Sequence, residues 1–142
     1  MAERQGAFTD LLDLSSKLPW QVVESMSWRE FEKLIGEAFR RRKFTVTGFG
    51  GGGANGGVDL GLMKNSERFL VQCKHWRKQQ VGVTVVRELN DVISAQGAHG
   101  GFVITGGRFT LEAWEFARQT KIQLIDGESM HELIGCSGEH VE

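Results

Sequence analysis

Two short apolar segments joined by a tight turn constrain the fold of this 142-residue chain most strongly. Residues 58–63 follow a glycine-rich stretch, and residues 69–75 follow a turn around Asn65. Each segment has the length and composition of a buried strand, and the short connection favours antiparallel pairing. The sequence therefore predicts a hairpin at the centre of a sheet.

Polar side chains interrupt both of these apolar strands. Asp59 lies near the start of the first, and Gln72 and Lys74 are two residues apart on the second. Residues i and i+2 share one face of a strand, so pairing can bring Asp59 beside the other two. Burying three such groups costs free energy unless they have a purpose. A carboxylate, an amide oxygen and an ammonium suit a metal ion and a phosphate, although Lys74 could also serve only as an ion-pair partner of Asp59.

The remaining pattern extends this hairpin into an α/β domain. Ser27 and Glu30 have the spacing of a capping box, which opens a helix that runs to about Arg42. Further elements follow in alternation: a strand at 44–47, a helix at 83–96, a strand at 101–105, a helix capped by Thr110, a strand at 122–125 and a helix at 129–134. The order α-β-β-β-α-β-α-β-α predicts a mixed central sheet flanked by helices on both faces.

The ends of the chain differ from this central region. Residues 7–18 have the pattern of a short amphipathic helix, so residues 1–26 are interpreted as a helical appendage or linker. The main domain is expected at 27–135, with a tail at 136–142. No apolar run approaches the roughly 18 residues that a membrane span needs, and no signal peptide is recognised, which makes a cytoplasmic setting the default expectation.

The two cysteines give no disulfide framework and match no zinc motif. Cys73 and Cys136 form at most one pair, and their spacing fits none of the usual ligand patterns. Cys73 lies in the middle of the predicted central strand. We therefore expect it to be a buried free thiol.

Charge is unevenly distributed along the chain, although the formal net charge is only -1. The segment from Arg68 to Arg87 contains five cationic side chains and no Asp or Glu; between its ends lie Lys74, Arg77 and Lys78. A solvated basic surface is one interpretation. The other is contact with nucleic-acid phosphates through Arg77, Lys78 and Arg87.

The glycine-rich stretch resembles a nucleotide-binding motif only superficially. Residues 48–53 match G-x-G-x-x-G and follow a strand, but they lead into a second strand instead of a helix. A dinucleotide site needs the helix N-terminus, so nucleotide binding is disfavoured. The stretch is interpreted as a flexible connection, as room for a polymer backbone to approach Asp59, or as both.

Glu32 is a fourth candidate for the site. It borders the apolar stripe of the first long helix, and Gly36 one turn later leaves space above its carboxylate. The helical pattern is equally compatible with an ordinary surface acid.

Several of these motifs together resemble the Mrr-type restriction endonucleases of the PD-(D/E)XK nuclease superfamily. The resemblance covers about residues 27–134 and rests on Phe31-Glu32, the glycine-rich stretch, Gly57-Val58-Asp59-Leu60, Val71-Gln72-Cys73-Lys74-His75-Trp76, Val81-Gly82-Val83 and Val86-Arg87-Glu88-Leu89. It implies a restriction-endonuclease-like αβββαβ core, which agrees with the order of elements above. One departure is Asn55, which stands where relatives often carry an acid.

The resemblance implies a role for each polar residue. Asp59 matches the metal-binding acid, Lys74 the catalytic lysine and Glu32 the helical acid, while Gln72 replaces the usual second acid. The implied cofactor is Mg²⁺, with Mn²⁺ as a substitute, and its ligands would be Asp59, Gln72, the Cys73 carbonyl and Glu32. Hard oxygen ligands of this kind suit Mg²⁺.

The resulting hypothesis is a metal-dependent endonuclease that hydrolyses DNA phosphodiester bonds, as in Mrr-type restriction of modified DNA. Cutting both strands of a duplex calls for two active sites, which is compatible with a homodimer. One alternative is a structure-specific nuclease such as a junction resolvase. The other is a DNA-binding or interaction module whose nuclease site is idle.

Overall fold

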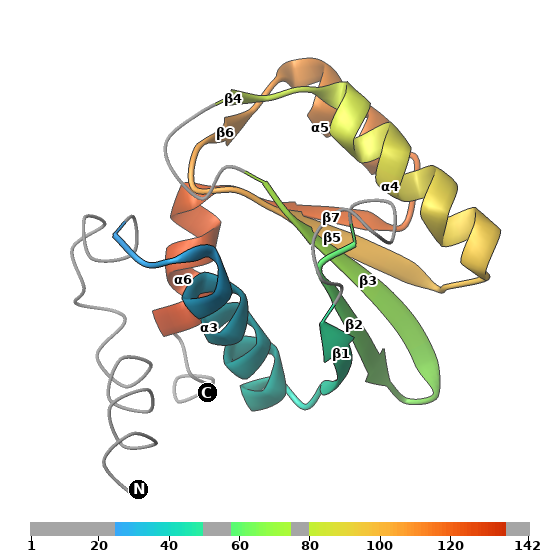
Figure 1. Cartoon of the computed structure of the whole chain (residues 1–142). Coiled ribbons are helices and arrows are strands. Elements are labelled where there is room, and N and C mark those ends of the chain that lie inside the picture. The colour runs from blue at the N-terminus through green and yellow to red at the C-terminus, as the bar shows by residue number, and fades with distance from the viewer. Residues whose placement is uncertain (1–24, 50–57, 75–79, 136–142) are drawn as a thin grey trace, which may run out of the picture.

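In the computed structural model, which describes residues 25–49, 58–74 and 80–135, five strands form one mixed sheet in the order β1-β2-β3-β5-β7 (Figure 1). The first three pair antiparallel, whereas β3, β5 and β7 run parallel. The strands are β1 (Thr45–Phe49), β2 (Leu60–Lys64), β3 (Glu67–Cys73), β5 (Gly100–Ile104) and β7 (Ile122–Ile125). This arrangement confirms the predicted mixed sheet.

Helices cover both faces of the sheet, as the sequence predicts. Figure 1 shows α3 and α6 together on one face, and α4 and α5 on the other. Their bounds are α3 (Trp28–Arg41), α4 (Val83–Gln96), α5 (Leu111–Arg118) and α6 (Gly127–Gly135). A hairpin followed by helical crossovers leads to this three-layer arrangement, because parallel strands need a connection that crosses a face of the sheet.

The central strand β3 contributes to two separate cores. Val71 packs with α3 residues such as Phe31 and Leu34, all fully buried, on one face. Leu70 packs with α4 residues such as Leu89 on the other. Because side chains alternate along a strand, a strand buried on both faces is apolar almost throughout. Polar residues at its end are therefore held in a dry environment.

A close approach of β5 to β3 requires glycine at one position of the sheet. A Cβ atom on Gly101 would lie 2.6 Å from the Leu70 carbonyl oxygen. Real Cβ atoms do not come so close to backbone, so any side chain here would push the two strands apart. Gly101 thereby helps to set the spacing of the strands that carry the site.

Most predicted element boundaries differ from the observed ones by one or two residues, and two elements were missed. The last helix begins at Gly127 instead of 129, because Asp126 caps it: the Ser129 N–H donates to Asp126 Oδ1 at 2.9 Å. The missed strands β4 (Gln80–Val81) and β6 (Arg108–Phe109) form a separate two-stranded parallel sheet near α5 (Figure 1). Strands of two residues are too short to show a period in the sequence.

Some expectations fall outside the described residues. These are the helix at 7–18, most of the glycine-rich stretch with Asn55, the cations Arg77 and Lys78, and Cys136. Within the described ranges, the structure contains no helix that is both long enough and apolar enough to cross a membrane. Cys73 is buried and unpaired, as expected from the sequence.

Helix α3 ends in a left-handed turn that is built around a lysine. Lys43 has φ of 75°, and its N–H donates to the Arg40 carbonyl, while the Phe44 N–H donates to that of Phe39. These are the two bonds of a Schellman motif, and the Phe39 and Phe44 rings pack 5.2 Å apart across it. Helix α4 ends in the same way, but there Gly97 holds the left-handed position.

This difference predicts opposite effects of two substitutions. Lys43→Gly removes the clash between Cβ and backbone at a left-handed position and should stabilise the fold by about 0.5–1 kcal/mol. Gly97→Ala introduces that clash and should destabilise it by about 1 kcal/mol. Urea denaturation of the two variants and the wild type measures both changes. Equal or reversed effects would contradict the assigned turn.

Candidate active site

The site begins where β2 and β3 part. The Asp59 N–H donates to the Val71 carbonyl at 2.7 Å, and Leu60 pairs with Val71 as the last regular pair of the ladder. Beyond it, the Cys73 N–H donates to Asp59 Oδ2 at 2.7 Å instead of to a backbone carbonyl of β2. The Asp59 carboxyl group thus takes the place of a backbone carbonyl of β2 and is fixed at the end of β3.

This hydrogen bond also explains why β3 ends earlier than the sequence predicted. The strand was expected to reach residue 75, but β3 ends at Cys73. The Lys74 N–H still donates to the Ile104 carbonyl at 2.7 Å, so Lys74 continues beside β5 although β2 has diverged. Lys74 is half-buried, and its positive charge lowers the pKa of Asp59.

Glu32 faces this point from α3. Its side chain is only 7% exposed, so the alternative of an ordinary surface acid was wrong. The capping box at Ser27 and Glu30, present in the structure, fixes where α3 begins and therefore which residues face the sheet. The Glu32 carboxyl group raises the pKa of Asp59. Two carboxyl groups from separate elements thus meet in the interior.

The pKa of Asp59 is raised from 3.8 to about 7. Burial is the largest cause, since it disfavours the charged form, and the adjacent Glu32 raises the pKa further. The hydrogen bond from the Cys73 N–H and the charge of Lys74 oppose this rise. Without a cation, the carboxyl pair therefore retains a proton up to about neutral pH.

Cys73 lies beside the carboxyl pair but has the properties of a packing residue. Its side chain is 2% exposed. Burial raises the pKa of the Cys73 thiol well above its ordinary value, and the charges of Asp59 and Glu32 raise it further. The thiol therefore stays protonated, and the observed polar contribution of this residue is its backbone N–H.

Two buried oxygen atoms at this end of the sheet lack a hydrogen-bond partner in the described part of the chain. They are Glu32 Oε2 and Gln72 Oε1. A buried acceptor without a partner costs roughly 1–3 kcal/mol, so such atoms call for an explanation. Carboxylate and amide oxygens are the hard ligands that Mg²⁺ prefers, so each of these two atoms has the chemistry of a metal ligand. The residues present fit such a metal.

The donor set contains few ionisable ligands. Within residues 25–49, 58–74 and 80–135, no group of three His, Cys, Asp or Glu side chains could hold a metal ion. Asp59 and Glu32 supply two carboxylates, so a third side-chain ligand would have to be neutral. Gln72 is 3% exposed and is the residue that the sequence predicted for this place.

Sequence reasoning missed two features of the site. The first is the backbone donor of Cys73, which side-chain patterns do not reveal. The second is Thr105, which is fully buried directly after Ile104, the neighbour of Lys74 in the sheet. The Thr105 hydroxyl accepts from the Gly107 N–H at 3.1 Å and shapes the turn that leaves β5. A polar residue at the end of an otherwise apolar strand was the available signal.

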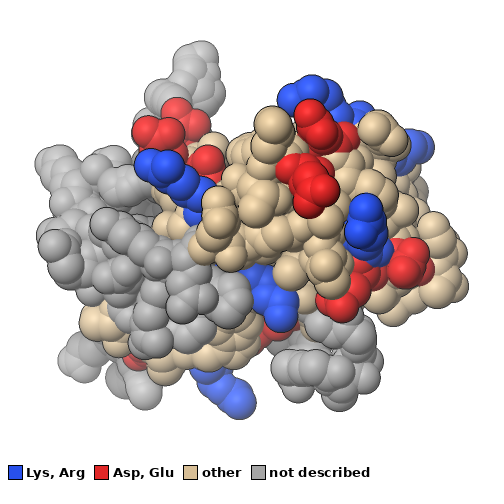
Figure 2. Space-filling view, turned by 90° about the horizontal axis from the view of Figure 1, so that it is seen from above, with Lys and Arg blue, Asp and Glu red and all other residues tan. Residues whose placement is uncertain are grey.

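Arg87 is the one predicted DNA contact among the described residues, and it lies on α4. Its guanidinium carbon is 5.6 Å from the centre of the Phe116 ring on α5. Figure 2, which looks down on the side of the molecule where α4 and α5 lie, shows acidic and basic side chains interspersed. The exposed charged residues of these helices are Arg87, Glu88, Asp91, Glu112, Glu115 and Arg118. The basic run of the sequence therefore does not form a single-sign surface there.

The fold and the position of the site define the chain as restriction-endonuclease-like. Its structure is similar to that of the MspJI restriction endonuclease solved with a 27-mer oligonucleotide, with a TM-score of 0.62, 18% identity and coverage of 87% of this chain and 31% of the other. It is also similar to a repair endonuclease from Pyrococcus abyssi, with a TM-score of 0.53, 18% identity and coverage of 70% and 46%.

Sequence comparison gives the family. The model of the Mrr_cat restriction endonuclease family matches residues 23–134, and the chain belongs to that family. It is also 32% identical over 117 residues to the uncharacterized protein y4cE of Sinorhizobium fredii. That match covers 74% of this chain and 29% of y4cE, so the chain spans less than a third of the relative's length.

The raised pKa of Asp59 predicts the pH dependence of stability without metal. Since the folded state binds this proton more tightly than the unfolded state, the free energy of unfolding should fall as pH rises from about 4 to about 7. Asp59→Asn should remove this decline, whereas Glu88→Gln, at an exposed position, should retain it. Denaturation in EDTA across this pH range measures the effect. Wild-type stability that rises with pH over this range, or the same slope in all three proteins, would contradict the assignment.

Proposed function

We propose that this domain is a metal-dependent endonuclease that hydrolyses DNA phosphodiester bonds, in the manner of Mrr-type restriction of modified DNA. Membership of the Mrr_cat family supports the class of enzyme. The observation that carries the proposal is the buried Asp59–Glu32 pair, with unpartnered oxygens of Glu32 and Gln72, beside the ammonium of Lys74. A structural ion pair would not leave acceptors unsatisfied.

In this proposal Asp59, Glu32 and the Gln72 amide oxygen hold Mg²⁺ or Mn²⁺, together with the Cys73 carbonyl. When bound, such a metal would lower the pKa of a coordinated water and compensate negative charge on the phosphate. The Cys73 N–H keeps the Asp59 carboxylate oriented, since its bond to Oδ2 leaves Oδ1 available. Placing a cation at this point would also favour loss of the proton that the pair otherwise retains.

Lys74 would act on the substrate. Its ammonium would orient the attacking water or balance the charge that develops on the phosphate. Its half-buried position limits hydration and strengthens such an interaction. The backbone bond to Ile104 holds Lys74 beside β5 and restricts where its side chain can reach.

DNA as the substrate rests on the relatives and on the cations after Lys74. The MspJI structure contains an oligonucleotide, and the Pyrococcus abyssi protein is a repair endonuclease. Arg77, Lys78 and Arg87 are proposed to contact phosphates. Of these, Arg87 is exposed and partly held by Phe116, so it would add affinity without reading the sequence.

Cleavage assays with supercoiled plasmid test the proposed chemistry. In Mg²⁺ or Mn²⁺ the wild type should nick or cut DNA, and Lys74→Ala should lower the rate by at least about a hundredfold. Lys33→Ala, on the exposed face of α3, is the matched control and should keep wild-type activity. The substrates should include several methylation patterns and a branched junction.

The pattern of cleavage separates the proposal from its alternatives. Preference for methylated plasmid supports restriction of modified DNA, while preference for the junction would favour a structure-specific nuclease. If wild type and Lys74→Ala are equally inactive on every substrate, the domain is not the proposed nuclease. DNA binding retained without metal binding would then favour the interaction module.

The role of Arg87 is tested by the salt dependence of DNA binding. Each phosphate contact releases counterions, so the affinity should fall steeply with salt, and Arg87→Ala should reduce the slope of log affinity against log salt by about 1. Arg118→Ala removes an exposed arginine from α5 and should leave the slope unchanged. Fluorescence anisotropy with a labelled duplex gives both slopes. Equal slopes for wild type and Arg87→Ala would exclude this contact.

A further inference from the structure

A pair of cavities lies at the opposite end of the sheet from the Asp59–Glu32 carboxyl pair. Two cavities, of about 680 and 610 Å³, share His99, Thr120 and Lys121. These residues lie at the starts of β5 and β7, whereas Asp59 is held at the end of β3. We call the two cavities together the far-end groove. The length of β3, roughly 20 Å at about 3.3 Å per residue, separates it from the candidate active site.

One wall of the far-end groove is aromatic. The Phe69 ring meets Phe44 edge-on, with centres 5.6 Å apart, and meets His99 in a similar way at 5.3 Å. All three residues line the smaller cavity, and the two phenylalanines are only partly buried. Exposed ring surface of this kind is suited to contact with a flat, apolar group of a ligand.

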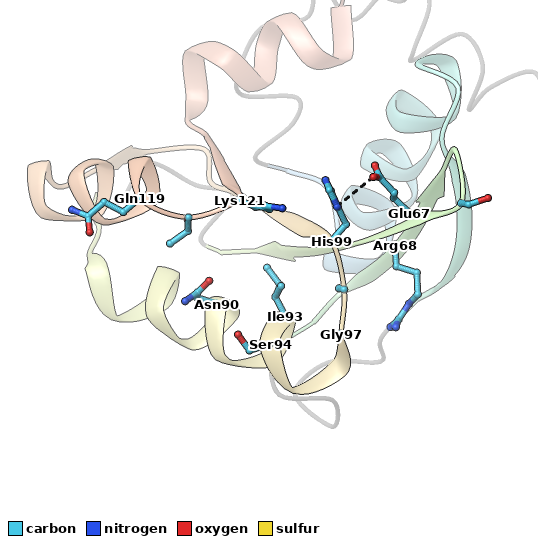
Figure 3. Close-up of a pocket in the computed structure, with 12 residues that line it drawn as sticks. Glu67, Arg68, Asn90, Ile93, Ser94, Gly97, His99, Gln119 and Lys121 are labelled. Atoms are coloured by element: carbon cyan, nitrogen blue, oxygen red, sulfur yellow. Dashed lines mark ion pairs between the residues drawn. The ribbon is translucent and has the colours of Figure 1, made fainter.

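The charged side chains that line the groove are mostly cationic. They are Lys64, Arg68, Lys121 and a single acid, Glu67. Glu67 is already paired, since its Oε2 lies 3.4 Å from His99 Nδ1, as the dashed line in Figure 3 marks. The groove therefore offers net positive charge to a ligand.

Two of these cations are held in place by the protein. Lys64 Nζ lies 4.6 Å from the centre of the Phe44 ring and donates to the Arg42 carbonyl at 3.1 Å. Arg68 donates to the Gln96 side chain and backbone carbonyl, both at 3.0 Å. Lys64 therefore places a cation directly at the aromatic wall.

Lys121 is the cation best placed to meet a ligand. It is exposed, and no ion pair or hydrogen bond of its side chain is found within the described residues. In Figure 3 its side chain runs from the start of β7 toward His99, and Lys121 lines both cavities. Together with Lys64 it flanks the aromatic wall.

We propose that the far-end groove binds a nucleotide, with the base against the wall of Phe44, Phe69 and His99 and the phosphate at Lys121. Cavities of about 300–1,000 Å³ accommodate ligands of this size, and bases stack well on aromatic side chains. Lysine binds phosphate as a compact charge. The nucleotide could be free or part of a single strand, because both present the same base and phosphate. The groove uses no residue of the candidate active site, so this inference does not depend on nuclease activity.

Titration of the full chain in EDTA tests the proposal. The probes are deoxyadenosine monophosphate, deoxyadenosine, inorganic phosphate and a short oligothymidylate, and binding is followed by backbone amide NMR shifts. The monophosphate or the oligonucleotide should saturate the signals of residues such as Phe69, His99 and Lys121. Lys121→Ala should weaken that binding by about tenfold, the loss of one charge-assisted contact. Lys33→Ala and Asp59→Asn should bind as the wild type does.

The outcomes distinguish a free nucleotide from a nucleic-acid strand, and they show which results would refute the proposed site. Saturation by the monophosphate identifies a free nucleotide, whereas saturation by the oligonucleotide alone identifies a strand. Either result supports the nucleotide site if Lys121→Ala weakens the binding of that probe. Several results would overturn it: no saturable binding at millimolar concentration, equal binding of inorganic phosphate, no effect of Lys121→Ala, or shifts confined to the residues around Asp59. None of these depends on whether the chain cleaves DNA.

Discussion

The hydrogen bond from the Cys73 N–H to the Asp59 carboxylate is the interaction on which the candidate active site depends. It replaces a rung of the β2–β3 ladder with a side chain, and it does so at the point where β3 still pairs with β5. The two strands therefore diverge while one of them remains fixed in the sheet. The acid that starts β2 is thereby anchored at the end of β3, close to Lys74 and beneath Glu32 of α3.

The energetic consequence is a buried carboxyl pair whose cost is only partly offset by its neighbours. Two neighbouring carboxyl groups in a dry environment cannot both be ionised cheaply, which is why the pKa of Asp59 is raised to about 7. Lys74 offsets only part of this cost, and Glu32 and Gln72 each keep a buried oxygen without a partner among the described residues. In the proposed metal site, the neutral amide of Gln72 would supply a ligand without adding a third negative charge. This choice limits repulsion in the free protein and also lowers the charge available to attract a metal.

Much of the fold could be predicted from the sequence because its elements have clear periods and ends. Helix α4 and strand β7 have the predicted bounds, since Gly97 ends the first and a short, mostly aliphatic segment forms the second. The early end of β3 could not be predicted, because it results from a contact between residues 14 positions apart. Strands β4 and β6 were too short to recognise.

The residue types of the candidate site could be predicted from the sequence, but their burial and neighbouring charges could not. The spacing of Gln72 and Lys74 indicated a shared location, while the burial of Glu32 follows from the packing of α3 against the sheet. Of the basic run that begins at Arg68, folding places Arg87 among acids of α4 and α5, whereas Arg77 and Lys78 lie outside the described residues. The far-end groove left no trace in sequence patterns, because Phe44, Phe69 and Lys121 come from three separate elements.

The most direct test of the central claim is to locate a metal ion. Crystals soaked in Mn²⁺ and measured at a wavelength near the manganese absorption edge give an anomalous signal at each bound ion. We expect a peak at the end of β3, coordinated by Asp59 and by oxygens of Glu32 and Gln72, directly or through water, and absent in Asp59→Asn. A wild-type crystal without a peak there, or with manganese bound only elsewhere, would contradict the account of this site.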